Sequence, residues 1–94
     1  MVDNEHEELD ELRAEIDKVD LRLLDDLSEF IRDRMRIVEK IGAYKRKAGL
    51  KIPDSKREEN VLRDRADRGR SRGLSGEMVR KIWEAIIRFS KERE

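Results

Sequence analysis

The feature that most constrains the fold is an apolar stripe that continues for about forty residues before any helix breaker. Apolar side chains recur at spacings of three and four, the period of one face of an α-helix. The first residue that disfavours a helix is Gly42, which a helix tolerates at some cost. The sequence therefore predicts one long helix from about Glu7 to Ala48, roughly 60 Å long. Its stripe comprises Leu9, Leu12, Ile16, Val19, Leu23, Leu27, Phe30, Ile37, Ile41 and Tyr44.

Two shorter helices are predicted to follow the long one. The segment AGLKIPD ends the long helix, with Gly49 as its C-terminal cap and Pro53 beyond it. Either Asp54 or Ser55 can cap a second helix, which begins in the segment DSKREENVLRDRADRGR. After the break GRSRGLSGE, Ser75 can cap a third helix.

The small apolar content makes a second chain necessary. Only 36% of the 94 residues are hydrophobic and 49% are charged, so one chain can form only a small core. A compact domain of this size has a radius of gyration of about 13 Å, and two short helices shield only part of a much longer one. We therefore predict a single all-α domain over residues 1–94, with an acidic leader at 1–6. It has one long and two shorter helices and forms an intertwined homodimer.

Composition argues against several classes of partner. Basic and acidic residues number 23 each, so no net charge draws nucleic acid. The sequence has no cysteine, and its single histidine, His6, cannot form a metal cluster. No apolar run approaches the roughly 18 residues of a membrane span, and the N-terminus lacks the apolar region of a secretion signal. We expect a cytoplasmic protein that binds no metal, membrane or nucleic acid.

Two cations lie within the apolar stripe. At about 100° per residue counted from Phe30, Arg34 and Lys45 fall at about 40° and 60°, among Ile37 and Ile41. A buried cation without a partner costs several kcal/mol. Each of the two therefore needs a carboxylate nearby in the fold or a ligand.

Other polar side chains also point toward the predicted interior. Any one of them can lie over apolar surface with its charged end in water. For any residue taken alone, we prefer this structural interpretation to a role in a site. As a set, however, the inward cations outnumber the acids although the chain is neutral. This indicates a site for a small dianion, because guanidinium groups bind carboxylates bidentately. The set comprises four cations (Arg13, Arg34, Lys45, Arg57), two acids (Glu58, Glu94) and one hydroxyl (Ser90).

These residues lie in segments that resemble the all-helical (AroQ-type) chorismate mutases of the shikimate pathway. The segments are LRAEIDKVD at 12–20, RMRIVEKIGAYK at 34–45, IPDSKREENVL at 52–62 and IIRFSKERE at 86–94. The resemblance implies an intertwined dimer with shared active sites and no cofactor. It also implies the activity, the pericyclic Claisen rearrangement of chorismate, a dicarboxylate, to prephenate in aromatic amino-acid biosynthesis.

The resemblance further implies catalytic roles for three residues. Arg34 corresponds to the arginine that binds a substrate carboxylate within its own chain. Lys45 corresponds to the lysine that hydrogen-bonds a carboxylate and the ether oxygen of the breaking bond. Glu94 stands where many bacterial members have a glutamine that donates to this oxygen, so its carboxyl group must be protonated to help.

The remaining roles concern substrate binding. Arg13 corresponds to the arginine that crosses the dimer to hold a carboxylate. Asp54, through its backbone, and Glu58 correspond to positions that contact the ring hydroxyl. Arg57 corresponds to a further active-site arginine, and Ser90 to a hydroxyl near the ring carboxylate.

The sequence departs from the family pattern in its spacing, and it leaves other functions open. Four more residues than usual separate Asp20 from Arg34, about one turn plus 40°, which a helical stripe absorbs as a stutter. Isochorismate pyruvate lyases use a similar cationic site on the same fold. A helical dimerisation or regulatory module that binds a dianion without converting it is the other alternative.

Overall fold

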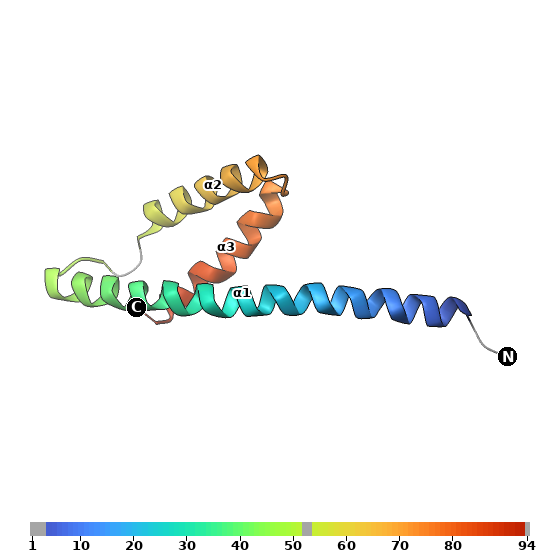
Figure 1. Ribbon diagram of the computed structural model, residues 1–94. Coiled ribbons are helices and arrows are strands. Elements are labelled where there is room, and N and C mark those ends of the chain that lie inside the picture. The colour runs from blue at the N-terminus through green and yellow to red at the C-terminus, as the bar shows by residue number, and fades with distance from the viewer. Residues whose placement is uncertain (1–3, 52–53, 94) are drawn as a thin grey trace. The chain divides into compact units, whose positions relative to one another are not determined.

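The computed structural model describes residues 4–51 and 54–93, which form three α-helices and no strand. In chain order these are α1 (Asn4–Ala48), α2 (Ser55–Ser71) and α3 (Gly76–Lys91), as labelled in Figure 1. The all-α class and the pattern of one long and two shorter helices are therefore confirmed. Within the described residues, no helix has an apolar stretch long enough to cross a membrane.

The C-terminal end of α1 has the predicted glycine cap. Gly49 adopts φ of 70°, a left-handed conformation that glycine reaches without a steric penalty. The N–H of Leu50 donates to the carbonyl of Lys45 at 2.8 Å, and the N–H of Gly49 donates to Arg46. This hydrogen-bond pair is the Schellman motif, which satisfies the last carbonyls of a helix.

The N-terminal caps of α2 and α3 are side chains identified from the sequence. The carboxylate of Asp54 accepts the N–H of Arg57 at 3.0 Å, so Asp54, rather than Ser55, caps α2. The hydroxyl of Ser75 accepts the N–H of Met78 at 3.2 Å and caps α3 as predicted.

The chain divides into two units, residues 1–34 (unit 1) and residues 35–94 (unit 2). Unit 2 has a small core in which α2 and α3 form a hairpin. The guanidinium of Arg80 on α3 also binds the carboxylate of Glu59 on α2 at 3.0 Å. The buried apolar side chains are Val38 of α1, Val61, Leu62 and Ala66 of α2, and Val79 and Ile86 of α3.

Unit 1 has no comparable core among its described side chains. Along this part of α1 the apolar stripe lies open, with Ile16 and Val19 each 58% exposed and Leu23 63% exposed. An isolated amphipathic helix gains little stability in water, because most helical stability comes from packing of the apolar face. The exposed stripe agrees with the argument that one chain cannot cover it, and the homodimer remains a prediction.

Close packing of α2 on α3 depends on Gly69. A Cβ atom at this position would lie 2.5 Å from Cγ2 of Val79, well inside van der Waals contact. We expect Gly69→Ala to lower the free energy of unfolding by about 1–3 kcal/mol, the usual cost of overpacking. Urea denaturation at a fixed protein concentration measures this change.

The matched control is the same substitution in a Val79→Ala background, which removes the clashing Cγ2 atom and leaves the Cβ atom of residue 79 at 3.2 Å. There Gly69→Ala should cost less than in the wild type, because the closest contact is gone and alanine favours a helix over glycine by about 1 kcal/mol. Equal losses in both backgrounds would show that contact with Val79 is not the cause.

Candidate functional site

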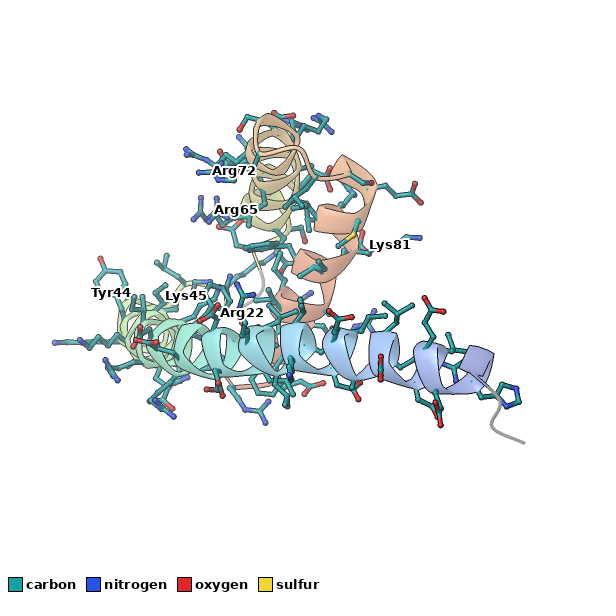
Figure 2. All side chains as sticks on the ribbon, turned by 45° about the vertical axis from the view of Figure 1, so that its right-hand side comes forward. Arg22, Tyr44, Lys45, Arg65, Arg72 and Lys81 are labelled. Atoms are coloured by element: carbon teal, nitrogen blue, oxygen red, sulfur yellow. The ribbon has the colours of Figure 1, made fainter. Side chains whose placement is uncertain are left out.

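The two cations of the apolar stripe differ in burial from most of their charged neighbours on α1. Arg34 and Lys45 are half-buried, whereas Arg32, Lys40 and Lys47 are exposed. The difference follows from helical periodicity, since a separation of eleven positions returns to nearly the same face of a helix. Figure 2 shows Lys45 and its exposed neighbour Tyr44 near the C-terminal end of α1.

The first turn of α2 holds three of the predicted residues. The carboxylate of Asp54 caps the helix, and its carbonyl accepts the N–H of Glu58 at 3.0 Å. These bonds fix the backbone from which Arg57 and Glu58 project. Arg57 is exposed, whereas Glu58 is half-buried.

Glu58 forms an ion pair with Lys91, the last residue of α3. The Nζ atom of Lys91 lies 3.0 Å from Oε1 of Glu58, and the two side chains are 45% and 26% exposed. The pair therefore orients Glu58 and ties the start of α2 to the end of α3. Lys91 was not identified from the sequence, because spacing along one helix carries no information about a partner on another.

Ser90 is the most buried of the predicted site residues that the structure describes. It is 6% exposed, and its hydroxyl donates to the carbonyl of Ile86, one turn earlier, at 2.8 Å. Its Oγ also lies 3.9 Å from the sulfur of Met35. The end of α3 thus contacts α1 within unit 2. To donate to a ligand carboxylate, the hydroxyl must rotate away from Ile86.

Two hollows lie on the helices of unit 2. The smaller, about 200 Å³, contains Glu58 but no other predicted site residue. The larger, about 520 Å³, runs along α3 and contains none of them. Neither hollow on its own gathers the cations predicted to bind a dianion. The smaller is lined by Glu58, Leu62, Glu84, Ile87, Arg88 and Lys91, and the larger by Ser75, Glu77, Met78, Lys81, Ile82 and Ala85.

The remaining predicted residues lie elsewhere. Arg13 is exposed and belongs to unit 1, as does Arg34. Glu94 lies outside the described residues. Within unit 2, Glu58 pairs with Lys91, the residue that follows the buried Ser90.

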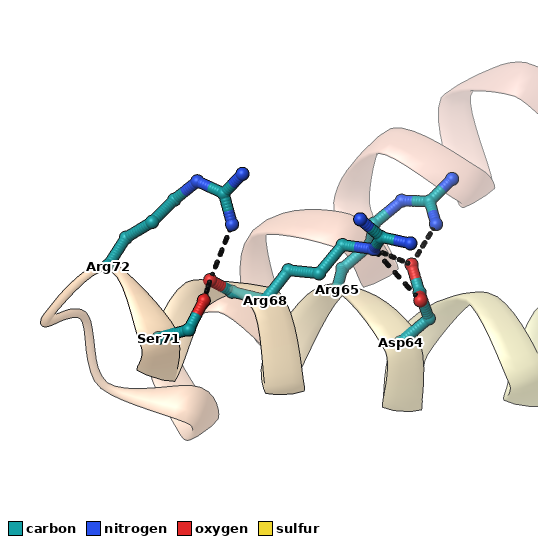
Figure 3. Close-up of polar contacts among 5 residues, drawn as sticks. All are labelled: Asp64, Arg65, Arg68, Ser71 and Arg72. Atoms are coloured by element: carbon teal, nitrogen blue, oxygen red, sulfur yellow. Dashed lines mark hydrogen bonds and ion pairs between the residues drawn. The ribbon is translucent and has the colours of Figure 1, made fainter.

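A separate group of charges on α2 is local to that helix. Asp64 accepts hydrogen bonds from Arg68, through Nε at 3.0 Å, and from Arg65 (Figure 3). The bond from Arg68 and then that from Arg65 lower the pKa of Asp64 below its usual value. Arg72 donates to the carbonyl of Arg68 at 2.8 Å near the end of the helix. These contacts involve none of the predicted site residues.

Comparison with known proteins gives one result. The family model for chorismate mutase type II matches residues 12–94, and the chain therefore belongs to this all-helical family. No curated protein and no solved structure gives a significant match. All eight residues predicted to form the site fall within the matched range.

The pair of Glu58 and Lys91 can be tested through stability. We expect a double-mutant cycle of Glu58→Ala and Lys91→Ala to give a coupling energy of about 1 kcal/mol, the upper end for partly exposed pairs. Glu77 and Lys81 form a control pair at 3.2 Å, 78% and 72% exposed, for which about 0.3 kcal/mol is expected. Urea denaturation measures both. A coupling energy no larger than that of the control pair would mean that Lys91 does not hold the Glu58 side chain in position.

Proposed function

We propose that this chain is a chorismate mutase, an isomerase that converts chorismate to prephenate in the cytoplasm as part of aromatic amino-acid biosynthesis. The observation that carries the proposal is the match to the chorismate mutase type II family over residues 12–94. The half-buried positions of Arg34 and Lys45 on an otherwise apolar face support it. A cation in such a place is suited to an anionic ligand.

The rearrangement does not require any group of the protein to react with the substrate. It is unimolecular and needs no nucleophile, proton transfer or cofactor. The enzyme must hold the flexible enolpyruvyl arm over the ring in its reactive conformation, which is an orientation effect. It must also stabilise the negative charge that develops on the ether oxygen with donors already in place. A rigid arrangement of cations can accomplish both tasks.

The proposed roles divide between these two tasks. Arg34, Arg57 and the Arg13 of a second copy hold the substrate carboxylates. Lys45 donates to the ether oxygen. Glu94 acts there too when protonated, since an ionised carboxylate would repel the growing charge.

The ring of the substrate is proposed to lie near the place where the start of α2 meets the end of α3. The Asp54 carboxylate is engaged as the helix cap, which supports a contact to the ring hydroxyl through the Asp54 backbone. Glu58, oriented by Lys91, is proposed to accept from the same hydroxyl. Ser90 is proposed to donate to the ring carboxylate after its hydroxyl turns from Ile86.

The active form is proposed to be an intertwined homodimer. The apolar stripe of unit 1 is exposed along its described length, and a second copy would bury it. Arg13 lies on the same part of α1 and is exposed. It could therefore reach a site formed mainly by the other copy. A shared site would combine Arg13 of one copy with the cations of the other.

The direct test is incubation of the purified chain with chorismate and, separately, with isochorismate, followed by ultraviolet absorbance and identification of the products. Formation of prephenate is expected. Turnover of isochorismate to salicylate and pyruvate would instead identify a lyase. Binding of chorismate without conversion of either compound would identify a regulatory module.

The proposed mechanism predicts large effects at two residues. Arg34→Ala and Lys45→Ala should each lower kcat/KM at least about a hundredfold, the effect of removing one preorganised charge-stabilising donor. The matched controls are Arg32→Ala and Arg46→Ala, which remove exposed cations of the same helix and should leave activity near normal. Circular dichroism checks folding. Near-normal rates in folded Arg34 or Lys45 variants would rule out the mechanism.

A further inference from the structure

A hydroxyl and a thioether from different helices meet within unit 2. Ser90 of α3 is 6% exposed, and Met35 of α1 is half-buried. The Oγ atom of Ser90 lies 3.9 Å from the sulfur of Met35, and a thioether sulfur is a weak hydrogen-bond acceptor. The same hydroxyl donates to the carbonyl of Ile86 at 2.8 Å. The direction of the Ser90 hydroxyl therefore depends on which neighbouring acceptor binds its proton most strongly.

The thioether suits a hydroxyl that has to change partners. A serine hydroxyl has one proton to donate, so Ser90 can donate to a substrate carboxylate only after it releases the carbonyl of Ile86. The sulfur of Met35 competes weakly for that proton, and a flexible methionine side chain fills irregular space beside the hydroxyl. A strong acceptor at the same place would instead hold the proton and compete with the substrate.

We propose that Met35 is a positioning residue for Ser90 and also a modification site, at which oxidation of the sulfur weakens binding of the substrate. This inference rests on the proposed function, in which Ser90 donates to the ring carboxylate. Hydrogen peroxide transfers one oxygen atom to the thioether, so that an S–O bond forms and the O–O bond breaks. The sulfur loses two electrons, and the peroxide is reduced to water. The product is methionine sulfoxide, a polar side chain.

The position of the sulfur explains the expected effect on binding. An oxygen atom added to a sulfur 3.9 Å from Oγ can come within hydrogen-bond distance of the Ser90 hydroxyl. The hydroxyl then donates to the sulfoxide, and the ring carboxylate loses its donor. Because this hydrogen bond is made in the bound substrate as well as in the transition state, its loss raises KM and leaves kcat nearly unchanged. Enzymatic reduction of the sulfoxide reverses the effect.

The chain offers a matched methionine on another surface. Met78 of α3 is 54% exposed, and it lines the larger hollow, which contains none of the predicted site residues. Peroxide should reach Met78 at least as readily as the half-buried Met35. The third methionine, Met1, lies outside the described residues and is common to all variants. Met35→Leu and Met78→Leu therefore show which sulfur is responsible for a response to peroxide.

The first experiment treats the full chain with hydrogen peroxide and follows each methionine by peptide mass spectrometry. In the wild type and in Met78→Leu, the KM for chorismate should rise at least about tenfold, the effect of losing one hydrogen bond to a charged group. In Met35→Leu, KM should be the same before and after treatment. Methionine sulfoxide reductases should restore the KM of the wild type.

Three results of this experiment would overturn the proposal. One is a rise in KM when Met35→Leu is treated, and another is no rise in Met78→Leu. The third is a Met35 that stays reduced in wild-type protein whose Met78 is fully oxidised.

A second experiment separates acceptor strength from a general loss of packing. Met35→Gln places a strong acceptor on an unbranched side chain and should raise KM at least about tenfold without any oxidant. Ser90→Ala should raise KM by a similar factor, because it removes the donor. In the Ser90→Ala background, neither Met35→Gln nor peroxide should raise KM further, since residues that act through one contact are not additive. Equal rises with and without the hydroxyl would show a general disturbance of unit 2 and overturn the role of Ser90.

Failure of this inference can be distinguished from failure of the proposed function. Turnover of chorismate by the untreated wild type tests the function. An active enzyme whose KM does not respond to peroxide or to Met35→Gln would overturn the inference alone. For a chain that binds chorismate without converting it, the Kd from isothermal titration calorimetry replaces KM in every comparison.

Discussion

The structure depends on burial of the apolar face of α1, which its own chain leaves largely open. Unit 2 has a core in which Val61 and Val79 are nearly inaccessible, whereas Ile16 and Leu23 of unit 1 are more than half exposed. At about 25 cal/mol for each Å² of apolar surface removed from water, covering a stripe of ten such residues is a larger gain than any ion pair on the surface. In the proposed homodimer, the same burial would set the environment of the cations within the stripe, so that association and ligand binding would depend on one helical face.

Most charges of this chain have little influence on that face. Two ion pairs each lie within one helix near the surface, Asp64 with Arg68 on α2 and Glu77 with Lys81 on α3. Such pairs contribute little to stability. Arg34 and Lys45 differ because they interrupt an apolar surface. A cation there loses water when the surface is covered, and the loss must be compensated by an anion. The proposed substrate, with two carboxylates, is such an anion. The number of charges in the sequence thus matters less than the few positions where they meet apolar neighbours.

The helices could be predicted because their signals are local. The stripe predicts α1, and the caps at Gly49 and Ser75 fall where their side-chain chemistry requires them. The start of α1 was misplaced by three residues, since it begins at Asn4 rather than near Glu7. Acidic residues near the N-terminus interact favourably with the positive end of the helix dipole, which favours a longer helix. The choice between Asp54 and Ser55 stayed open because both side chains can cap a helix.

The candidate site was less predictable because it depends on contacts between helices. Periodicity alone placed Arg34 and Lys45 on the inner face of α1. It also placed Arg57 near the buried Val61 of α2, yet Arg57 is exposed. In the structure, the residue of this first turn that pairs with α3 is Glu58, through Lys91. The partnership of Glu58 and Lys91 joins two helices, and no spacing in the sequence encodes it.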